Sequence, residues 1–284
     1  MKEVFQFRRW LVEFSLLDGA RLNRLSFDGF DLLTTEPESF HPPSTDYGEY
    51  ENRAVYAYDD CFPSVDSCVY PGLDWKIPDH GELCWLVWEV SKVPNRLSFS
   101  VRSKILPVLF RREMRFNEAG ITWTFEVINE GDKKLPFQHV MHPLMTLREI
   151  AGIKLPEFDS VYDKILEHTM DLKDPEAVQN FLLSQVPGST NMLFLQKVKR
   201  GIMSWTYRNG IHLAVTYSEK YFPSLGIWWN NSAYPDEEGC RRNECAFEPV
   251  SGSNSVLSDA YKAGNCLWVL PGKPFSWEIQ WKIT

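Results

Sequence analysis

Three histidines and one glutamate in this chain have the settings that proton-transfer chemistry requires. His80 lies in the stretch IPDHGELCW, while His139 and His142 lie in PFQHVMHPLM. Glu248 lies in NECAFEPVSG, between a phenylalanine and a proline. A carboxylate held against apolar groups resists ionisation, so its pKa rises toward the working pH. Because imidazole already titrates near neutrality, the two groups could together take a proton from one oxygen and give one to another.

Each of these residues also has an ordinary structural explanation. A histidine beside a proline in an apolar strand is often a core residue whose hydrogen bonds are satisfied. Glu248 could simply pair with Arg241 or Arg242 in the same stretch. The spacing of these residues alone therefore indicates a soluble β protein that could be an enzyme.

Other kinds of reactive site have weaker support in the sequence. His139 and His142 are three residues apart between two prolines, and on a strand such residues point to opposite faces. The chain has neither an HExxH motif nor a His-x-His pair, so we expect no metal site. Ser251 lacks the GxSxG context of a nucleophile. Cys84 and Cys245 lack the electropositive setting that would lower the pKa of a thiol.

The composition is that of a soluble globular protein and argues against a nucleic-acid partner. Of the 284 residues, 44% are hydrophobic and 24% are charged, and the formal net charge is −8. Phosphate binding needs clustered lysines and arginines. The densest basic stretch, Arg111 to Arg115, is interrupted by Glu113, which is typical of a solvated strand face.

The sequence also predicts the compartment. The six cysteines form no CxxC pair and no compact framework, as expected for reduced thiols. No apolar run approaches the ~20 residues of a membrane span, and no signal peptide is evident. We therefore expect a cytoplasmic protein that does not enter a membrane.

Alternation of apolar and polar residues predicts that most of the chain forms β-strands. The segment GITWTFEVINEG would place Ile121, Trp123, Phe125 and Val127 on one face, and FSWEIQWKI alternates in the same way. Asn209-Gly210, between two alternating runs, predicts a hairpin. Residues 35–50 are rich in proline and polar side chains and predict a long surface loop.

Only one segment clearly predicts a helix. In DLKDPEAVQNFLLSQVPG, Asp174 is a suitable N-cap, Pro175 suits the first turn, and Pro187-Gly188 would end the helix. Many strands with one or two short helices indicate an all-β protein, specifically a large antiparallel β-sandwich. We predict a single domain over residues 1–284.

At these residues the sequence resembles the aldose 1-epimerase (galactose mutarotase-like) superfamily, in particular its shorter bacterial-type members. The segment around His80 is similar to the family's His-Gly segment, the one ending in HVMHPLM to its His-Pro segment, and NECAFEPVSG to its final Glu-Pro segment. GARLNRLSFDGFDLL resembles the opening hairpin, and LWVLPGKPFSWEIQWKI resembles the closing turn and strand. The order and spacing of these segments carry the resemblance. It implies the galactose mutarotase-like supersandwich.

The resemblance also implies a role for each matching residue. Glu248 matches the general base that removes the proton of the anomeric hydroxyl, and His142 matches the general acid that protonates the ring oxygen. His80 matches the histidine that hydrogen-bonds the region of the ring oxygen. His139 matches no catalytic position. Ring opening, rotation about C1–C2 and closure would exchange the anomers with no cofactor.

Departures from the family pattern suggest a sugar without a phosphate group. Members that act on hexose 6-phosphates carry arginines where this chain has AYDDCFPSV and Cys84. Asp59 and Asp60 could instead hydrogen-bond neutral hydroxyls, and Arg53 could replace one missing arginine. Core packing and sugar binding are both open for the remaining candidates, which are Trp229, Asn230 and Trp88, followed by Trp75 and Trp85.

The predicted function is therefore that of an aldose 1-epimerase-like isomerase acting on a monosaccharide. A non-catalytic carbohydrate-binding protein on the same fold is the alternative, and related β-sandwiches also include lyases and hydrolases. The identity of the sugar would be set by loops such as 35–60 and 229–244. The sequence leaves open whether the protein is a monomer or a dimer.

Overall fold

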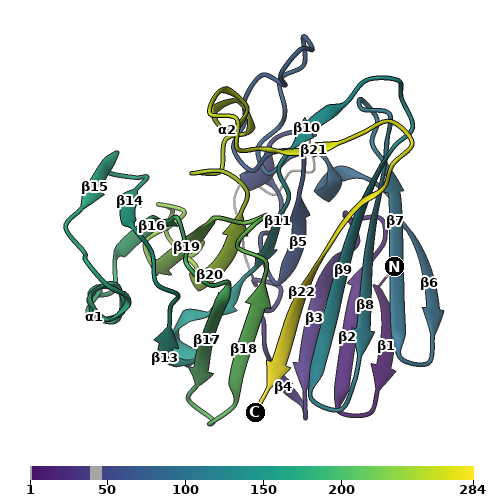
Figure 1. The fold of residues 1–284 in the computed structure, drawn as a ribbon. Helices are drawn as coiled ribbons and strands as arrows, with labels where there is room; N and C mark the ends of the chain where they lie inside the picture. The colour runs from purple at the N-terminus through teal and green to yellow at the C-terminus, as the bar shows by residue number, and fades with distance from the viewer. Residues whose placement is uncertain (1, 39–46) are drawn as a thin grey trace.

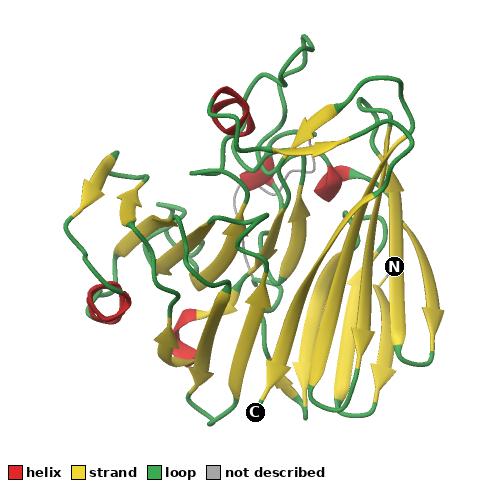
Figure 2. Ribbon diagram, viewed as in Figure 1, coloured by secondary structure: helices red, strands yellow, loops and turns green. Residues whose placement is uncertain are grey.

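Antiparallel β-sheets make up most of the computed structural model, which describes residues 2–38 and 47–284 (Figure 1, Figure 2). Half of the predicted 35–50 loop, residues 39–46, lies outside the described residues. All pairings between the named strands are antiparallel, as the predicted sandwich requires.

Two of the sheets contain six strands each. The first runs in the order β1 (Lys2–Phe7), β2 (Trp10–Ser15), β3 (Arg21–Phe27), β5 (Tyr58–Cys61) and β11 (Val140–Pro143), with β4 (Phe30–Asp31) also paired to β3. The second runs in the order β12 (Met145–Thr146), β20 (Asn243–Val250), β19 (Ser224–Asn231), β16 (Ser189–Gln196), β14 (Ser160–Asp163) and β15 (His168–Met170).

The largest sheet contains eight strands, and the smallest contains two. The large sheet runs in the order β13 (Ile150–Lys154), β17 (Ile202–Tyr207), β18 (His212–Tyr217), β22 (Phe275–Ile283), β9 (Gly120–Asn129), β8 (Val108–Phe116), β7 (Arg96–Arg102) and β6 (Glu89–Val93). The small sheet pairs β10 (Leu135–Phe137) with β21 (Leu267–Val269).

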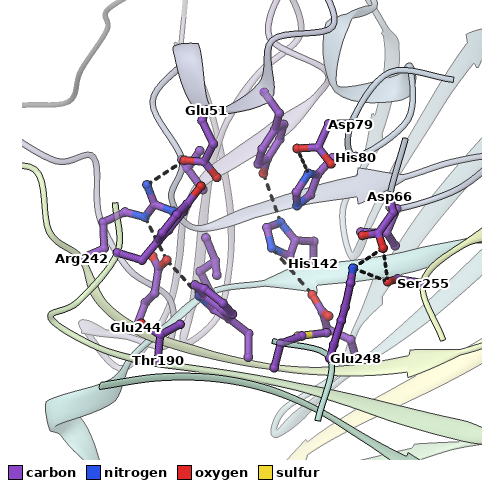
Figure 3. A pocket seen from close by; sticks show the side chains of 18 of the residues that line it. Glu51, Asp66, Asp79, His80, His142, Thr190, Arg242, Glu244, Glu248 and Ser255 are labelled. Atoms are coloured by element: carbon purple, nitrogen blue, oxygen red, sulfur yellow. Dashed lines mark hydrogen bonds and ion pairs between the residues drawn. The ribbon is translucent and has the colours of Figure 1, made fainter. Parts of the chain in front are cut away.

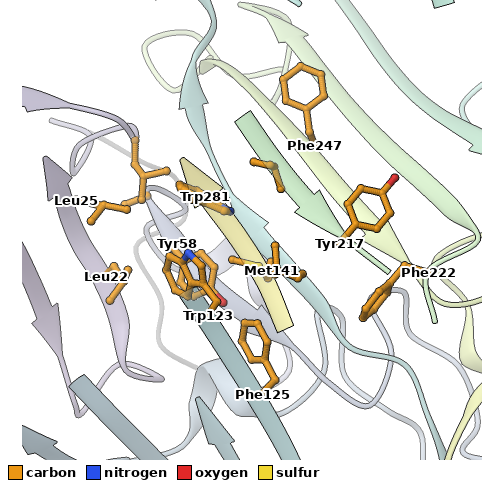
Figure 4. Packing of buried hydrophobic residues seen from close by; sticks show 14 of the residues in the cluster. Leu22, Leu25, Tyr58, Trp123, Phe125, Met141, Tyr217, Phe222, Phe247 and Trp281 are labelled. Carbon is orange, nitrogen blue, oxygen red and sulfur yellow. The ribbon is translucent and has the colours of Figure 1, made fainter. Parts of the chain in front are cut away.

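The core lies between the eight-stranded sheet and the two six-stranded sheets (Figure 4). Tyr58 of β5 packs on Trp123 of β9, with ring centroids 5.0 Å apart. Phe247 of β20 stacks on Trp205 of β17 at 5.1 Å. One continuous sheet therefore supports both six-stranded sheets, and it fixes β11 and β20 in position relative to each other.

The predicted strand patterns are confirmed. Along β9 the side chains of Ile121, Trp123, Phe125 and Val127 are buried, and the intervening residues are partly exposed. Strand β22 shows the same alternation, and β17 and β18 form the hairpin predicted at Asn209-Gly210. Strands with one buried face are easily recognised from alternating apolar and polar residues, because successive side chains point to opposite faces.

The predicted helix is also confirmed, and it ends earlier than expected. It is α1 (Pro175–Leu183), and the Asp174 side chain accepts a hydrogen bond from the backbone N–H of Ala177 at 2.8 Å. A second helix, α2 (Leu257–Lys262), was not located in the sequence, because it has six residues and no side-chain cap. The described part of the chain also contains three short 3₁₀ helices: Tyr50–Asn52, Leu83–Trp85 and Leu147–Glu149.

No helix among the described residues has the length and hydrophobicity that crossing a membrane would require.

Gly81 is fixed by a close contact with the neighbouring chain. Its φ is +74°, and a Cβ added there would lie 2.0 Å from the carbonyl oxygen of Phe62. Gly29 has a similar φ of +79° but has no atom within 4 Å of such a Cβ. The two glycines therefore separate the cost of the left-handed backbone from the cost of a steric clash.

We expect Gly29→Ala to lower the free energy of unfolding by roughly 1–2 kcal/mol, the cost of the left-handed conformation alone. Gly81→Ala should lower it by at least about 2 kcal/mol more, because the methyl group overlaps a backbone atom. Chemical denaturation of both variants measures the difference. Equal losses in the two variants would contradict the close packing of Gly81.

Candidate active site

The two sequence-predicted proton-transfer residues meet where the six-stranded sheets adjoin. His142 lies on β11 of the first sheet and Glu248 on β20 of the second, with His142 Nε2 3.7 Å from Glu248 Oε1 (Figure 3). Both residues are buried, at 7% and 4% exposure. The separation exceeds a hydrogen bond, and the two groups face a common cavity rather than forming a tight pair.

The local sequence explains why Glu248 points into this cavity. Cys245 and Phe247 face the hydrophobic core, so the alternating position of Glu248 faces the other way. Gly226 of β19 lies opposite Glu248 in the strand pairing. A Cβ added to Gly226 would lie 3.3 Å from Glu248 Oε2, so the glycine leaves room for the carboxylate.

His142 is held from behind by a buried carboxylate and a tyrosine. Its Nδ1 lies 2.9 Å from Asp59 Oδ1 and 3.2 Å from the Tyr50 hydroxyl oxygen. Tyr50 donates its hydroxyl proton to Asp59 Oδ2 at 3.0 Å. Arg21, also fully buried, lies 3.4 Å from the same Asp59 oxygen. The imidazole is thereby oriented with Nε2 toward Glu248.

His80 joins the same cavity from a strained turn. Its φ is +59°, a left-handed conformation that is uncommon for residues other than glycine. The Tyr50 ring stacks on the His80 ring at 3.7 Å with an angle of 8°, and Asp79 Oδ2 lies 3.1 Å from His80 Nδ1. Left-handed residues persist where surrounding contacts determine them, often at functional sites.

The charges around His142 and Glu248 shift both pKa values upward. Burial opposes the charged imidazole, but Asp59 and Glu248 outweigh it and raise the pKa of His142 to about 9. Burial raises the pKa of Glu248, opposed by His142 and His80. Burial would also raise the pKa of Asp59, but Arg21 and His142 hold it well below its usual range. A charged imidazole therefore faces a carboxylate whose affinity for a proton is increased.

The cavity has a volume of about 530 Å³, within the range of small-molecule sites. Its walls combine aromatic and aliphatic side chains with two clusters of charged groups. At one end, Lys164 binds Asp66 and Ser255; at the other, Arg242 lies 2.9 Å from Glu244 and 3.2 Å from Glu51 (Figure 3). The lysine and the arginine in the wall, Lys164 and Arg242, are therefore both paired with carboxylates.

The structure brings none of the aspartates, arginine, asparagine and tryptophans predicted to bind the substrate to the cavity. Asp59, Asp60 and Arg53 are buried beneath it or beside it and line none of its surface. Asp60 binds Arg112 and lies 3.0 Å from His139 Nε2, and Arg53 binds Asp18 and the Cys84 carbonyl. These positions do not favour the predicted contacts with a sugar, because Asp59 and Asp60 face the buried Arg21 and Arg112.

The predicted tryptophans also lie outside the cavity. Trp229 and Trp88 are core residues, and Trp75 and Trp85 are partly buried without lining it. Asn230 is fully buried, and its side chain accepts from the backbone N–H groups of Ala233 and Tyr234. It therefore supports the loop that follows β19 and does not line the cavity.

The tryptophan that lines the cavity is Trp228, which sequence reasoning missed. Leu225, Ile227 and Trp229 share the core face of β19, so the alternation itself places Trp228 on the opposite face. Its Nε1 donates to Glu244 Oε1 at 3.1 Å. Glu244, Arg242 and Lys164 were likewise missed, because their convergence depends on contacts between segments far apart in the chain.

His139 is a core residue, in agreement with the absence of a matching family position. Its ring packs against Phe110, Phe125 and Trp277. Burial lowers its pKa, opposed by Asp60. Neither Arg241 nor Arg242 pairs with Glu248: Arg241 binds Asp236, and Arg242 binds Glu51 and Glu244.

One group of described residues could in principle offer metal ligands. Single atoms of Asp59, Cys61 and His142 lie within 4.8 Å of one another. The donor set fits a metal poorly, because Asp59 already contacts Arg21 and Tyr50 through its oxygens. Burial also raises the pKa of the Cys61 thiol well above its usual value, and metals bind the thiolate.

Comparison with known proteins identifies the fold. No protein-family model and no curated protein sequence matches the chain. A solved structure from Escherichia coli K12, provisionally assigned as an aldose 1-epimerase, matches with a TM-score of 0.75 at 14% identity, covering 100% of this chain and 99% of that one. Galactose mutarotase-like proteins from Lactobacillus casei ATCC 334 and Clostridium acetobutylicum match with TM-scores of 0.70 and 0.69, each at 14% identity. They cover all of this chain and 100% and 98% of theirs.

The chain therefore has the galactose mutarotase-like fold, as its sequence predicted. At 14% identity these structural matches show the fold alone, and any activity depends on the residues of the site itself.

The raised pKa of His142 predicts how stability depends on pH. The charged form is favoured in the folded state, so its contribution is complete below the unfolded pKa near 6.5 and is lost as the pH rises through about 9. We expect the wild type to lose on the order of 2–3 kcal/mol of unfolding free energy over this range relative to His142→Gln. Denaturant titrations between pH 6 and pH 10 measure the difference. Parallel pH profiles for the two proteins would contradict the assigned charge state.

Proposed function

We propose that this protein is an aldose 1-epimerase-like isomerase that interconverts the anomers of an unphosphorylated monosaccharide. The observation that supports this most strongly is the facing pair of Glu248 and His142, 3.7 Å apart in a cavity large enough for a pyranose. The anomeric hydroxyl and the ring oxygen are bonded to the same carbon. One base and one acid at this separation can therefore reach both oxygens.

Ring opening needs one proton removed and one supplied. Glu248 takes the proton of the anomeric hydroxyl, the C1–O bond to the ring oxygen breaks, and His142 Nε2 gives its proton to that oxygen. The product is the open-chain aldehyde, with Glu248 protonated and His142 neutral. Since the pKa of Glu248 is raised, the carboxylate is a stronger base than an exposed one.

Ring closure uses the same two groups in reverse. After rotation about the C1–C2 bond, His142 takes the proton of the hydroxyl that attacks C1, and Glu248 returns its proton to the aldehyde oxygen. Both residues regain their starting states, so the cycle balances without a further reactant. The ring centroid of His80 lies 5.0 Å from that of His142, and in the proposed mechanism His80 hydrogen-bonds the sugar near its ring oxygen.

The charges of the wall favour a neutral sugar. Lys164 is bound to Asp66, and Arg242 to Glu51 and Glu244, so neither cation is left to neutralise a phosphate. An anionic sugar would also approach Glu248 and Asp79 in the same cavity. Like charges in a site of low dielectric repel strongly.

Substitution of the proposed acid and base tests the mechanism. We expect Glu248→Gln and His142→Gln each to lower the rate of anomer exchange by roughly 10²–10⁴-fold, because each removes one proton-transfer partner. Exchange NMR on a panel of free aldoses measures the rate. Glu278→Gln, an identical change on the exposed face of β22, should leave the rate unchanged.

An active wild type with unchanged exchange in Glu248→Gln would contradict the assigned base. A wild type that binds a sugar in calorimetry but exchanges none on the panel would favour the alternative, a non-catalytic carbohydrate-binding protein.

A comparison of substrates tests the proposed charge preference. We expect a free hexose to be turned over with a kcat/KM at least roughly tenfold above that of its 6-phosphate, because the lysine and the arginine that line the cavity among the described residues are both paired with carboxylates. The same exchange experiment with both sugars measures the ratio. A preference for the phosphorylated sugar would contradict the proposed substrate class.

A further inference from the structure

We propose that Asp59 is the positioning residue of His142. Together with Tyr50 and Arg21, it holds the Nδ1 proton of the imidazole inside the protein, so that only Nε2 exchanges protons in the cavity. The proposal rests on the proposed function for its catalytic meaning and on the buried contacts for its structural content.

The strand pairing places the two side chains together. Asp59 of β5 is the cross-strand partner of His142 of β11. Asp59 is 1% exposed, and its Oδ1 lies 2.9 Å from Nδ1, the distance of a charge-assisted hydrogen bond. Since an ionised carboxylate only accepts hydrogen bonds, Nδ1 has to carry the proton that joins them.

Tyr50 closes the remaining space around Nδ1. Its hydroxyl donates to Asp59 and lies 3.2 Å from Nδ1, so both groups within reach of that nitrogen among the described residues belong to the buried network. The same tyrosine ring stacks on His80. One side chain thus fixes the orientation of both cavity histidines.

Arg21 stabilises the ionised form of the buried Asp59 carboxylate. Its guanidinium lies 3.4 Å from Asp59 Oδ2, while its other nitrogens bind Asp18 and the Tyr56 carbonyl. An unpaired carboxylate at this depth would take up a proton and could no longer hold Nδ1–H. The arginine therefore keeps Asp59 in the state that its role requires.

Charged and titratable groups reach His142 from every neighbouring element. They are Asp59 and Cys61 on β5, Tyr50 on its 3₁₀ helix, His80 in the loop before Leu83–Trp85, and Glu244 and Glu248 on β20. Glu248 faces Nε2, and Asp59 faces Nδ1. Loss of either carboxylate should weaken proton binding, but only the loss of Asp59 releases the ring from its fixed orientation.

The structure contains a matched control for this pair. Asp60, the next residue on β5, is also fully buried, binds Arg112, and lies 3.0 Å from His139 Nε2. Asp60→Asn therefore removes the same charge from the same strand beside a different histidine. General loss of stability would affect both variants, whereas a change at His142 should appear only in Asp59→Asn.

The test follows the ring nitrogens of His142 by ¹⁵N NMR as a function of pH, with His142→Gln used to assign its signals. In the wild type we expect Nδ1 to stay protonated and Nε2 to lose its proton. In Asp59→Asn the midpoint of the His142 titration should move down by roughly 1–3 pH units. In Asp60→Asn this midpoint should stay at its wild-type value. The alkaline limb of the pH–rate profile should shift with the titration, and kcat should fall at least roughly tenfold while KM changes little.

A neutral wild-type His142 with its proton on Nε2 and none on Nδ1 would overturn the proposal, and this result needs no variant to fold. Equal shifts of His142 in Asp59→Asn and Asp60→Asn would overturn it as well. The NMR titration needs no substrate. If His142 titrates as expected and no sugar is exchanged, Asp59 keeps its positioning role and it is the proposed function that fails.

Discussion

The pairing of β5 with β11 places Asp59 directly across from His142, and the geometry of the candidate site depends on this register. On a strand, a slip of one residue turns every side chain to the opposite face. Such a slip would exchange Asp59 for Asp60 beside His142. Asp59 faces the cavity histidine, whereas Asp60 faces Arg112 of the eight-stranded sheet. The two adjacent aspartates thus bind partners in two different sheets, the first six-stranded sheet and the eight-stranded sheet.

The site concentrates charge where water is largely excluded. Arg21 and Arg112 are both fully buried, and each is paired with one of these aspartates. Burial of ions costs free energy that pairing only partly offsets. In return, the interior holds a charged His142 facing Glu248, a carboxylate with raised pKa. Groups whose pKa values are shifted in this way suit proton transfer to and from a sugar. A pair on the solvated surface would keep its ordinary pKa values.

Much of the fold could be predicted from the sequence, because alternation along strands such as β9 and β22 reports one buried face. Glu248, His142 and His80 could be predicted through the order of their segments. The wall residues could not, since Arg242 and Glu244 at one end of the cavity and Lys164 at the other line it only when segments far apart in the chain are folded together. Trp228 rather than Trp229 lines the cavity, and alternation along β19 already distinguished the two. Asp59 and Asp60 were assigned to a ligand because their buried arginine partners, Arg21 and Arg112, lie far away in sequence.

The central claim is that a monosaccharide binds between Glu248 and His142. A crystal structure with a bound monosaccharide tests it most directly. The account predicts the anomeric oxygen within hydrogen-bond distance of a Glu248 carboxylate oxygen, and the ring oxygen within the same reach of His142 Nε2. A sugar bound in this cavity with its anomeric carbon directed away from both residues, or bound only elsewhere on the molecule, would contradict it.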